Sequence, residues 1–170
     1  FLYDILNQII NNLMNSSQNN IINELVDDSH SKLAKSYLSF LSNNPERIFI
    51  LDDEKKYSGK KIISRVIKFC NELSKYDHEV VLLKSSNTTE WVLFYLAAKL
   101  KNKTVFIISE TADKNTLKLL HSNFKISFIF ENNKLIKFKE KIQSNTYSNL
   151  NNLEKRKSYD CIFTTGTTGS

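Results

Sequence analysis

Cysteine and histidine are scarce in this chain of 170 residues, which contains 2 Cys and 3 His. We expect both cysteines to be small buried hydrophobic residues, because Cys70 falls on the apolar face of a predicted helix and Cys161 in a β-like run. His30, His78 and His121 are isolated from one another, so we expect each at the surface or its boundary rather than as a ligand or base. Nothing in these numbers or spacings suggests a disulfide framework or a metal site.

The sequence also lacks an uninterrupted apolar run of membrane-spanning length, and no signal peptide is visible in it. A cytoplasmic protein without a transmembrane segment is therefore the expectation. The net charge of +6 and the pI of about 9.2 would suit a nucleic acid, but acidic residues are interleaved with the lysines and no nucleic-acid-binding motif accompanies them. The densest basic patch is interpreted as a solvated face, and it consists of Lys134, Lys137, Lys139 and Lys141. We expect no nucleic-acid partner.

Hydrophobic periodicity divides the chain at Asn43-Asn44-Pro45, which holds the only proline. Residues 1–14 and 21–41 carry helical apolar stripes, so residues 1–44 are predicted to form a helical N-terminal extension. Beyond it, strands are predicted at 47–51, 79–84, 104–109, 126–130, 135–138 and 159–164, helices at 59–75, 89–101 and 113–122, and turns or loops at 52–56, 132–133 and 145–157. This alternation predicts an α/β fold with a mainly parallel sheet flanked by helices.

Glycine is also scarce, and two of the 3 Gly lie within four positions of each other near the end of the chain. They belong to the run Phe163-Thr164-Thr165-Gly166-Thr167-Thr168-Gly169-Ser170, into which the strand predicted at 159–164 leads. Main-chain N–H groups of a strand-to-loop segment rich in glycine and hydroxyls commonly bind phosphate. The run is not a Walker A motif, since no lysine follows the glycines. From the residues alone, phosphate binding and a plain flexible loop both remain open.

The same run resembles the phosphate-binding signature of the adenylate-forming (AMP-binding) ligases, whose usual form is Tyr-Thr-Ser-Gly-Thr-Thr-Gly followed by Pro-Lys-Gly. Phe163 replaces the tyrosine and Thr165 the serine, so a ring and a hydroxyl are kept. The resemblance extends back to about Phe49, through residues 52–75, the strand that ends near Asn87, and residues 91–108. Lys103 stands where this family usually has glycine, and Ile108 where it usually has proline. The resemblance therefore identifies residues 45–170 as the N-terminal part of an AMP-binding domain in a longer protein.

This resemblance implies an acetyl-CoA synthetase-like N-terminal subdomain that takes part in a two-step reaction. A carboxylic acid is first activated by ATP to an acyl-adenylate, and the acyl group then passes to coenzyme A or to the phosphopantetheine of an acyl carrier protein. By family resemblance, the β- and γ-phosphates and a shared Mg²⁺ are expected at a set of seven residues, which we call the Thr/Gly segment: Thr164, Thr165, Gly166, Thr167, Thr168, Gly169 and Ser170. Catalytic residues are expected beyond Ser170, so the 170-residue chain alone is expected to be inactive.

The sequence alone leaves two other functions open. One is a different phosphate- or nucleotide-binding α/β enzyme, such as a kinase-like or transferase domain. The other is a non-catalytic module derived from a ligase, which the departures at Lys103 and Ile108 favour slightly. Nothing in the sequence names the acid that would be activated.

Overall fold

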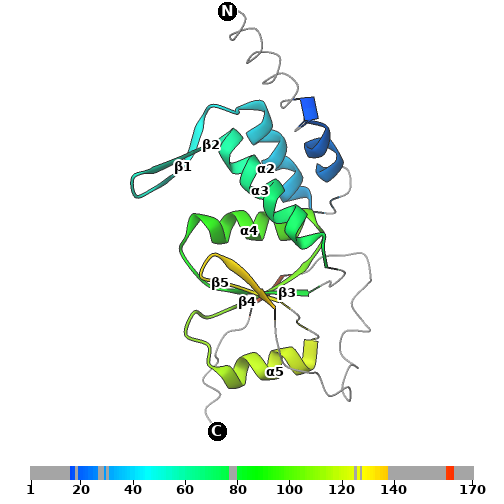
Figure 1. Cartoon of the computed structure of the whole chain (residues 1–170), viewed down its shortest axis with the longest axis vertical. Coiled ribbons are helices and arrows are strands. Elements are labelled where there is room, and N and C mark those ends of the chain that lie inside the picture. The colour runs from blue at the N-terminus through cyan, green and yellow to red at the C-terminus, as the bar shows by residue number, and fades with distance from the viewer. Residues whose placement is uncertain are drawn as a thin grey trace, which may run out of the picture.

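Helices and strands alternate along the chain in the computed structural model, which describes residues 16–17, 19–26, 29, 31–76, 80–124, 126, 128–137 and 160–162 (Figure 1). Residues 19–26 are helical. The further elements are α2 (Lys32–Asn43), β1 (Ile48–Asp52), β2 (Lys55–Ser58), α3 (Gly59–Leu73), β3 (Val80–Lys84), α4 (Thr89–Leu100), β4 (Thr104–Ile108), α5 (Lys114–Phe124), β5 (Phe128–Glu131), β6 (Lys134–Lys137) and β7 (Asp160–Ile162). The predictions for 1–14 and 145–157, and those for His30, His78, Lys139 and Lys141, fall outside the described residues.

A five-stranded sheet with the order β6-β5-β3-β4-β7 forms the centre of the fold. The neighbours β5, β3, β4 and β7 run parallel, and only the β5–β6 pair is antiparallel. The turn between β5 and β6 consists of Asn132 and Asn133, which both have positive φ. A two-residue hairpin turn of type I′ requires positive φ at both positions. The predicted α/β fold with a mainly parallel sheet is therefore confirmed.

Both faces of this sheet are covered by helices, α4 on one side and α5 on the other (Figure 1). Along β3 the side chains alternate between the two sides. Val81 and Leu83 pack in the core shared with α2, α3 and α4, whereas Val80 and Leu82 pack with Leu120 of α5. A strand buried on both faces has to be apolar at every position, which explains the continuous Val-Val-Leu-Leu run.

Helix α4 is apolar around most of its circumference because it lies between the sheet and the layer formed by α2 and α3 (Figure 1). Thr88 caps its N-terminus by accepting a hydrogen bond from the N–H of Trp91. At its C-terminus the N–H of Lys103 bonds to the carbonyl of Ala98, and Asn102 adopts a φ of 54°. This is a Schellman ending, in which asparagine takes the left-handed position. Lys103, which stands where adenylate-forming ligases usually have glycine, is therefore not the residue that needs positive φ.

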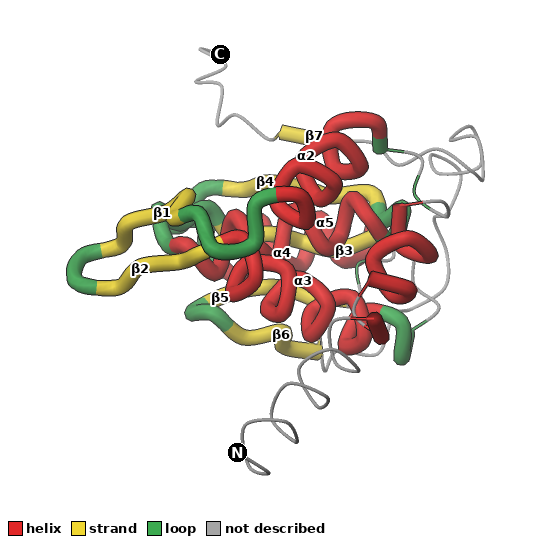
Figure 2. The backbone as a smooth tube through the Cα atoms, turned by 90° about the horizontal axis from the view of Figure 1, so that it is seen from above, coloured by secondary structure: helices red, strands yellow, loops and turns green. Residues whose placement is uncertain are grey.

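The segment before β3 contains a hairpin that sequence patterns did not predict. Residues 52–56 were expected to be a charged turn, but only Asp53 and Glu54 form the turn, and β2 pairs antiparallel with β1. The expectation was wrong because only one side chain of β2, Tyr57, is buried, so β2 carries no apolar alternation. The hairpin extends away from the five-stranded sheet (Figure 2).

The N-terminal helices pack on the rest of the described structure. Leu38 and Leu41 of α2 and Ile22 of the helical residues 19–26 belong to the same core as α3 and α4. The hydroxyl of Ser29 also donates to the carbonyl of Lys99, at the end of α4. The predicted boundary at 44/45 stays a prediction. No helix within the described ranges is long and apolar enough to span a membrane.

Candidate functional site

The topology points to the carboxyl ends of β3 and β4 as the place for a ligand. The two strands are neighbours, yet β3 leads into α4 on one face of the sheet and β4 leads into α5 on the other (Figure 1). In open α/β sheets, ligands bind outside the carboxyl ends of the parallel strands. The described candidate site is therefore this edge of the sheet.

Hydroxyl groups gather at this edge. After β3, the Ser86 hydroxyl donates to Thr88 Oγ1 at 3.4 Å, and the Thr88 hydroxyl donates to Asn133 Oδ1 at 3.0 Å. After β4, the side-chain oxygens of Ser109 and Thr111 lie 2.8 Å apart. The main chains of the two strand ends are joined as well, because the N–H of Ser85 bonds to the carbonyl of Ile108. These contacts order the two loops that follow β3 and β4.

The strand that precedes the Thr/Gly segment also ends at this edge. β7 lies beside β4 and runs parallel to it, with Val105 opposite Asp160 and Ile107 opposite Ile162. All seven residues of the Thr/Gly segment, Thr164, Thr165, Gly166, Thr167, Thr168, Gly169 and Ser170, lie outside the described residues. The structure describes residues 160–162 of the strand that leads to this segment. The described part of the predicted strand 159–164 is parallel, and it reaches Ile162 next to the carboxyl end of β4.

One cluster at β7 could not be seen in the sequence, and we call it the Asp160 clamp: Tyr95, Lys99 and Asp160. The Tyr95 hydroxyl donates to Asp160 Oδ2 at 2.8 Å, and Lys99 Nζ lies 3.0 Å from Asp160 Oδ1. Desolvation, followed by the hydrogen bond and the charge of Asp160, raises the pKa of Tyr95 to about 12. The only available signal was the spacing of four between Tyr95 and Lys99, which places them on one helical face.

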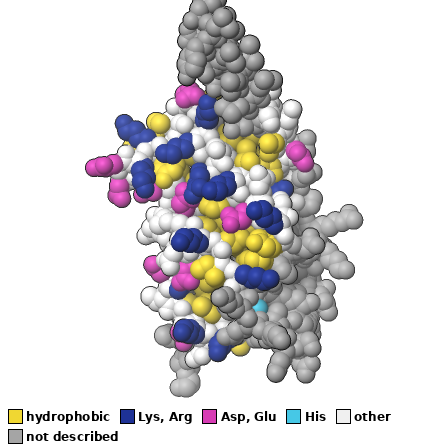
Figure 3. All heavy atoms as spheres, in the orientation of Figure 1, with side chains coloured by type: hydrophobic (Ala, Val, Ile, Leu, Met, Phe, Trp, Pro, Cys, Tyr) yellow, Lys and Arg dark blue, Asp and Glu magenta, His cyan; other side chains and the backbone are white. Residues whose placement is uncertain are grey.

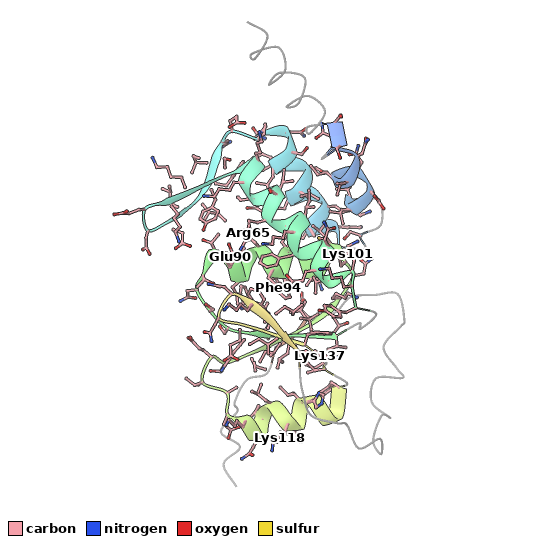
Figure 4. All side chains as sticks on the ribbon, viewed as in Figure 1. Arg65, Glu90, Phe94, Lys101, Lys118 and Lys137 are labelled. Atoms are coloured by element: carbon pink, nitrogen blue, oxygen red, sulfur yellow. The ribbon has the colours of Figure 1, made fainter. Side chains whose placement is uncertain are left out.

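A basic groove of about 590 Å³ lies beside the start of α4. Its lining residues come from β2, α3 and α4, and they are Lys55, Tyr57, Ser58, Lys60, Lys61, Ser64, Arg65 and Glu90. Basic side chains gather over the hairpin and α3 on the face seen in Figure 3. Arg65 forms a two-pronged ion pair with Glu90, with distances of 3.0 and 2.5 Å (Figure 4), and the Lys61 ammonium lies 4.4 Å from the centroid of the Tyr57 ring. These contacts join β2, α3 and α4.

Histidine and cysteine positions differ in how well they were predicted. His121 was expected at the surface or its boundary, but it is only 6% exposed, and its Nδ1 contacts the carbonyl of Ile126. The expectation was wrong because the chain after α5 folds back over the helix face that carries this side chain. Cys70 is buried, as predicted. Burial raises the pKa of its thiol to about 12. Within the described part of the chain, no cluster of three or more His, Cys, Asp or Glu side chains could hold a metal ion.

Comparisons by sequence find no relatives. No protein-family model matches the chain, and none of the curated proteins matches it. Solved structures do resemble it. IdnL1 matches with a TM-score of 0.52 at 11% identity, over 69% of this chain and 29% of IdnL1.

The N-terminal subdomain of NpsA from Klebsiella oxytoca is also similar. One structure of it matches with a TM-score of 0.47 at 13% identity, over 55% of this chain and 26% of that one. A second, in complex with 3-hydroxyanthranilyl-AMSN, matches with a TM-score of 0.46 at 14% identity, over 55% and 25%. The chain thus spans less than a third of the length of each of these proteins. At this level of identity, the similarity to IdnL1 shows a shared fold over the matched part of the chain.

Proposed function

We propose that this chain is part of an adenylate-forming ligase, which activates a carboxylic acid with ATP and transfers the acyl group to coenzyme A or a carrier-bound phosphopantetheine. The observation that carries the proposal is the order of two features in the chain. A parallel strand, β7, runs beside β4 as far as Ile162, and the Thr/Gly segment begins two residues later, at Thr164. Phosphate-binding segments of α/β proteins follow a strand at the carboxyl edge of the sheet.

The proposed reaction requires residues of this chain to compensate the negative charge of the reactants. A carboxylate and a triphosphate repel each other, so the enzyme has to neutralise the phosphates and hold the two reactants in line. The hydroxyls of Thr167 and Thr168 and the main-chain N–H groups around Gly166 and Gly169 would bind the β- and γ-phosphates. When bound, Mg²⁺ would share the negative charge through phosphate oxygens. A cytoplasmic location and an acyl carrier protein as partner belong to the same proposal.

Substitution of Gly166 tests the proposed phosphate site. In the full protein that contains this chain, we expect Gly166→Val to abolish carboxylate-dependent ATP–pyrophosphate exchange, because the side chain would prevent close approach of a phosphate to the main chain. The exchange is measured with Mg²⁺ across fatty, aryl and amino acids, and exchange with one class identifies the substrate class.

Lys134→Ala serves as the control, because Lys134 is exposed on β6. It should leave the exchange unchanged. Circular dichroism shows whether each variant keeps its fold. Retained exchange in a folded Gly166→Val protein would show that this segment is not the phosphate site.

A further inference from the structure

Three side chains connect β7 to α4, and they form the Asp160 clamp. Asp160 is 40% exposed and contacts two residues of the helix at once, Tyr95 through one carboxylate oxygen and Lys99 through the other. Tyr95 and Lys99 are one helical turn apart, so they present a hydroxyl and an ammonium on the same face of α4. The clamp therefore holds the first residue of β7 at two points.

Burial of the Lys99 ammonium costs free energy unless a nearby group compensates its charge. Its side chain is 8% exposed, and most other residues of α4 that face the interior are apolar. A buried ammonium loses its hydration and requires an anion and hydrogen-bond acceptors nearby. The carboxylate of Asp160 supplies the anion, so β7 carries a negative charge that compensates the buried ammonium.

The same face of α4 also reaches the end of β3. Trp91 stacks on Tyr95, with ring centroids 5.9 Å apart and an angle of 5° between the rings. The indole N–H of Trp91 donates to the carbonyl of Lys84, the last residue of β3, at 2.9 Å. Trp91, Tyr95 and Lys99 thus link the carboxyl end of β3 to the start of β7 along one helix face.

We propose that Asp160 is a positioning residue, which through Tyr95 and Lys99 fixes β7 against α4 and so holds in place the strand that leads to the Thr/Gly segment. This inference rests on the proposed function. Thr164 follows Asp160 by four residues, and a short strand at the border of the described sheet has few main-chain bonds to hold it. Phosphate-binding groups have to be held closely in place to act, and second contacts of this kind do so.

Two variants of the full protein test the role of the clamp. Asp160→Asn removes the charge that Lys99 needs, and Tyr95→Phe removes a single hydrogen bond. We expect Asp160→Asn to raise the KM for ATP by about tenfold, as the loss of a charge-assisted hydrogen bond implies. The KM for the acid should stay within about twofold, because the clamp acts on the phosphate segment alone. Tyr95→Phe should move the same constant in the same direction by less.

The matched control is Glu90→Gln, which breaks the Arg65–Glu90 ion pair between α3 and α4 without touching β7. It should leave the ratio of the two KM values unchanged. If Asp160→Asn and Tyr95→Phe fold but change both KM values equally, or neither, the clamp has no positioning role and the inference is wrong. If Asp160→Asn fails to fold, the two KM values of Tyr95→Phe decide whether the clamp has a positioning role.

A second measurement separates this inference from the proposed function. Hydrogen exchange of the main-chain amides of 160–162 is followed in the wild type and in the three variants. Faster exchange in Asp160→Asn and Tyr95→Phe, but not in Glu90→Gln, supports the clamp even if no acid gives ATP–pyrophosphate exchange, in which case only the proposed function fails. Unchanged exchange in both clamp variants overturns the clamp whatever the activity.

Discussion

At the scale of single residues, the clearest consequence of burial is a shifted titration. Tyr95 has its pKa raised from 10.0 to about 12, mainly by desolvation and then by Asp160. An unfolded tyrosine loses its proton near pH 10.0, whereas the folded protein retains it up to about pH 12. The raised pKa of Tyr95 therefore stabilises the folded state. This stabilisation is complete below pH 10.0 and is lost as the pH rises through about 12.

We accordingly expect the free energy of unfolding to fall between pH 10.0 and about 12, and to fall less in Tyr95→Phe than in the wild type. Urea unfolding at several pH values across this range measures the slope. A smaller slope should remain in the variant, because the pKa of Cys70 is also raised to about 12. An identical slope in both proteins would contradict the assignment to Tyr95.

Residue-scale predictions from sequence failed where a contact depends on the path of the chain. His121 lies on α5, and its partner carbonyl, Ile126, belongs to the segment that returns toward β5. Nothing in the local pattern fixes that return. Cys70 was predicted correctly because its burial follows from the apolar face of its own helix, which periodicity reports directly.

At the scale of elements, the third glycine has a role that the sequence did not reveal. A Cβ atom at Gly59 would lie 2.6 Å from the carbonyl oxygen of Asn44 and 2.7 Å from that of Leu41. Both are main-chain atoms at the end of α2, so they cannot move aside as a side chain would. Gly59 therefore permits the close approach between the start of α3 and the end of α2.

We expect Gly59→Ala to lower the free energy of unfolding by about 1–3 kcal/mol, the usual cost of forcing an atom into a packed site. Lys60→Ala is the control in the same helical turn, and because Lys60 is exposed it should change stability by less than about 0.5 kcal/mol. Thermal and urea unfolding measure both. Helix propensity alone favours alanine over glycine, so a stabilised Gly59→Ala variant would show that the contact is not limiting.

At the scale of the whole molecule, the described core is organised around a sheet covered on both faces. Leu83 lies on β3, between β4 and β5, and is 0% exposed. On the same side of the sheet, the rings of Phe94 and Phe130 stack with centroids 4.0 Å apart, and Phe69 meets both edge-on. This side joins α3, α4 and the sheet into one packed unit.

We expect Leu83→Ala to lower the free energy of unfolding by about 2–5 kcal/mol, because the cavity opens in the centre of this unit. Leu33→Ala is the matched control, since Leu33 is 76% exposed on α2 and its truncation should cost less than about 0.5 kcal/mol. Both values come from denaturant midpoints of the same protein. Equal losses in the two variants would mean that β3 is not the centre of the folding unit.

The amino-acid sequence was sufficient to predict the order and type of most elements after residue 45, the parallel character of the sheet and the place of the Thr/Gly segment after a predicted strand. These follow from local patterns, since the period of the apolar residues and the placement of turn residues act over a few positions. The hairpin strand β2 escaped prediction because only one of its side chains is buried.

Contacts between groups far apart in the sequence depend on the three-dimensional fold. Asp160 is separated from Tyr95 by 65 positions and from Lys99 by 61. Their contact exists because β7 pairs with β4 rather than with another strand, and that choice depends on long-range packing which no local pattern records. The strand order also placed β3 between β4 and β5, because the chain returned across β3 after β4 to form β5. The residues proposed to bind phosphate were thus found from the sequence, whereas the Asp160 clamp was found only from the fold.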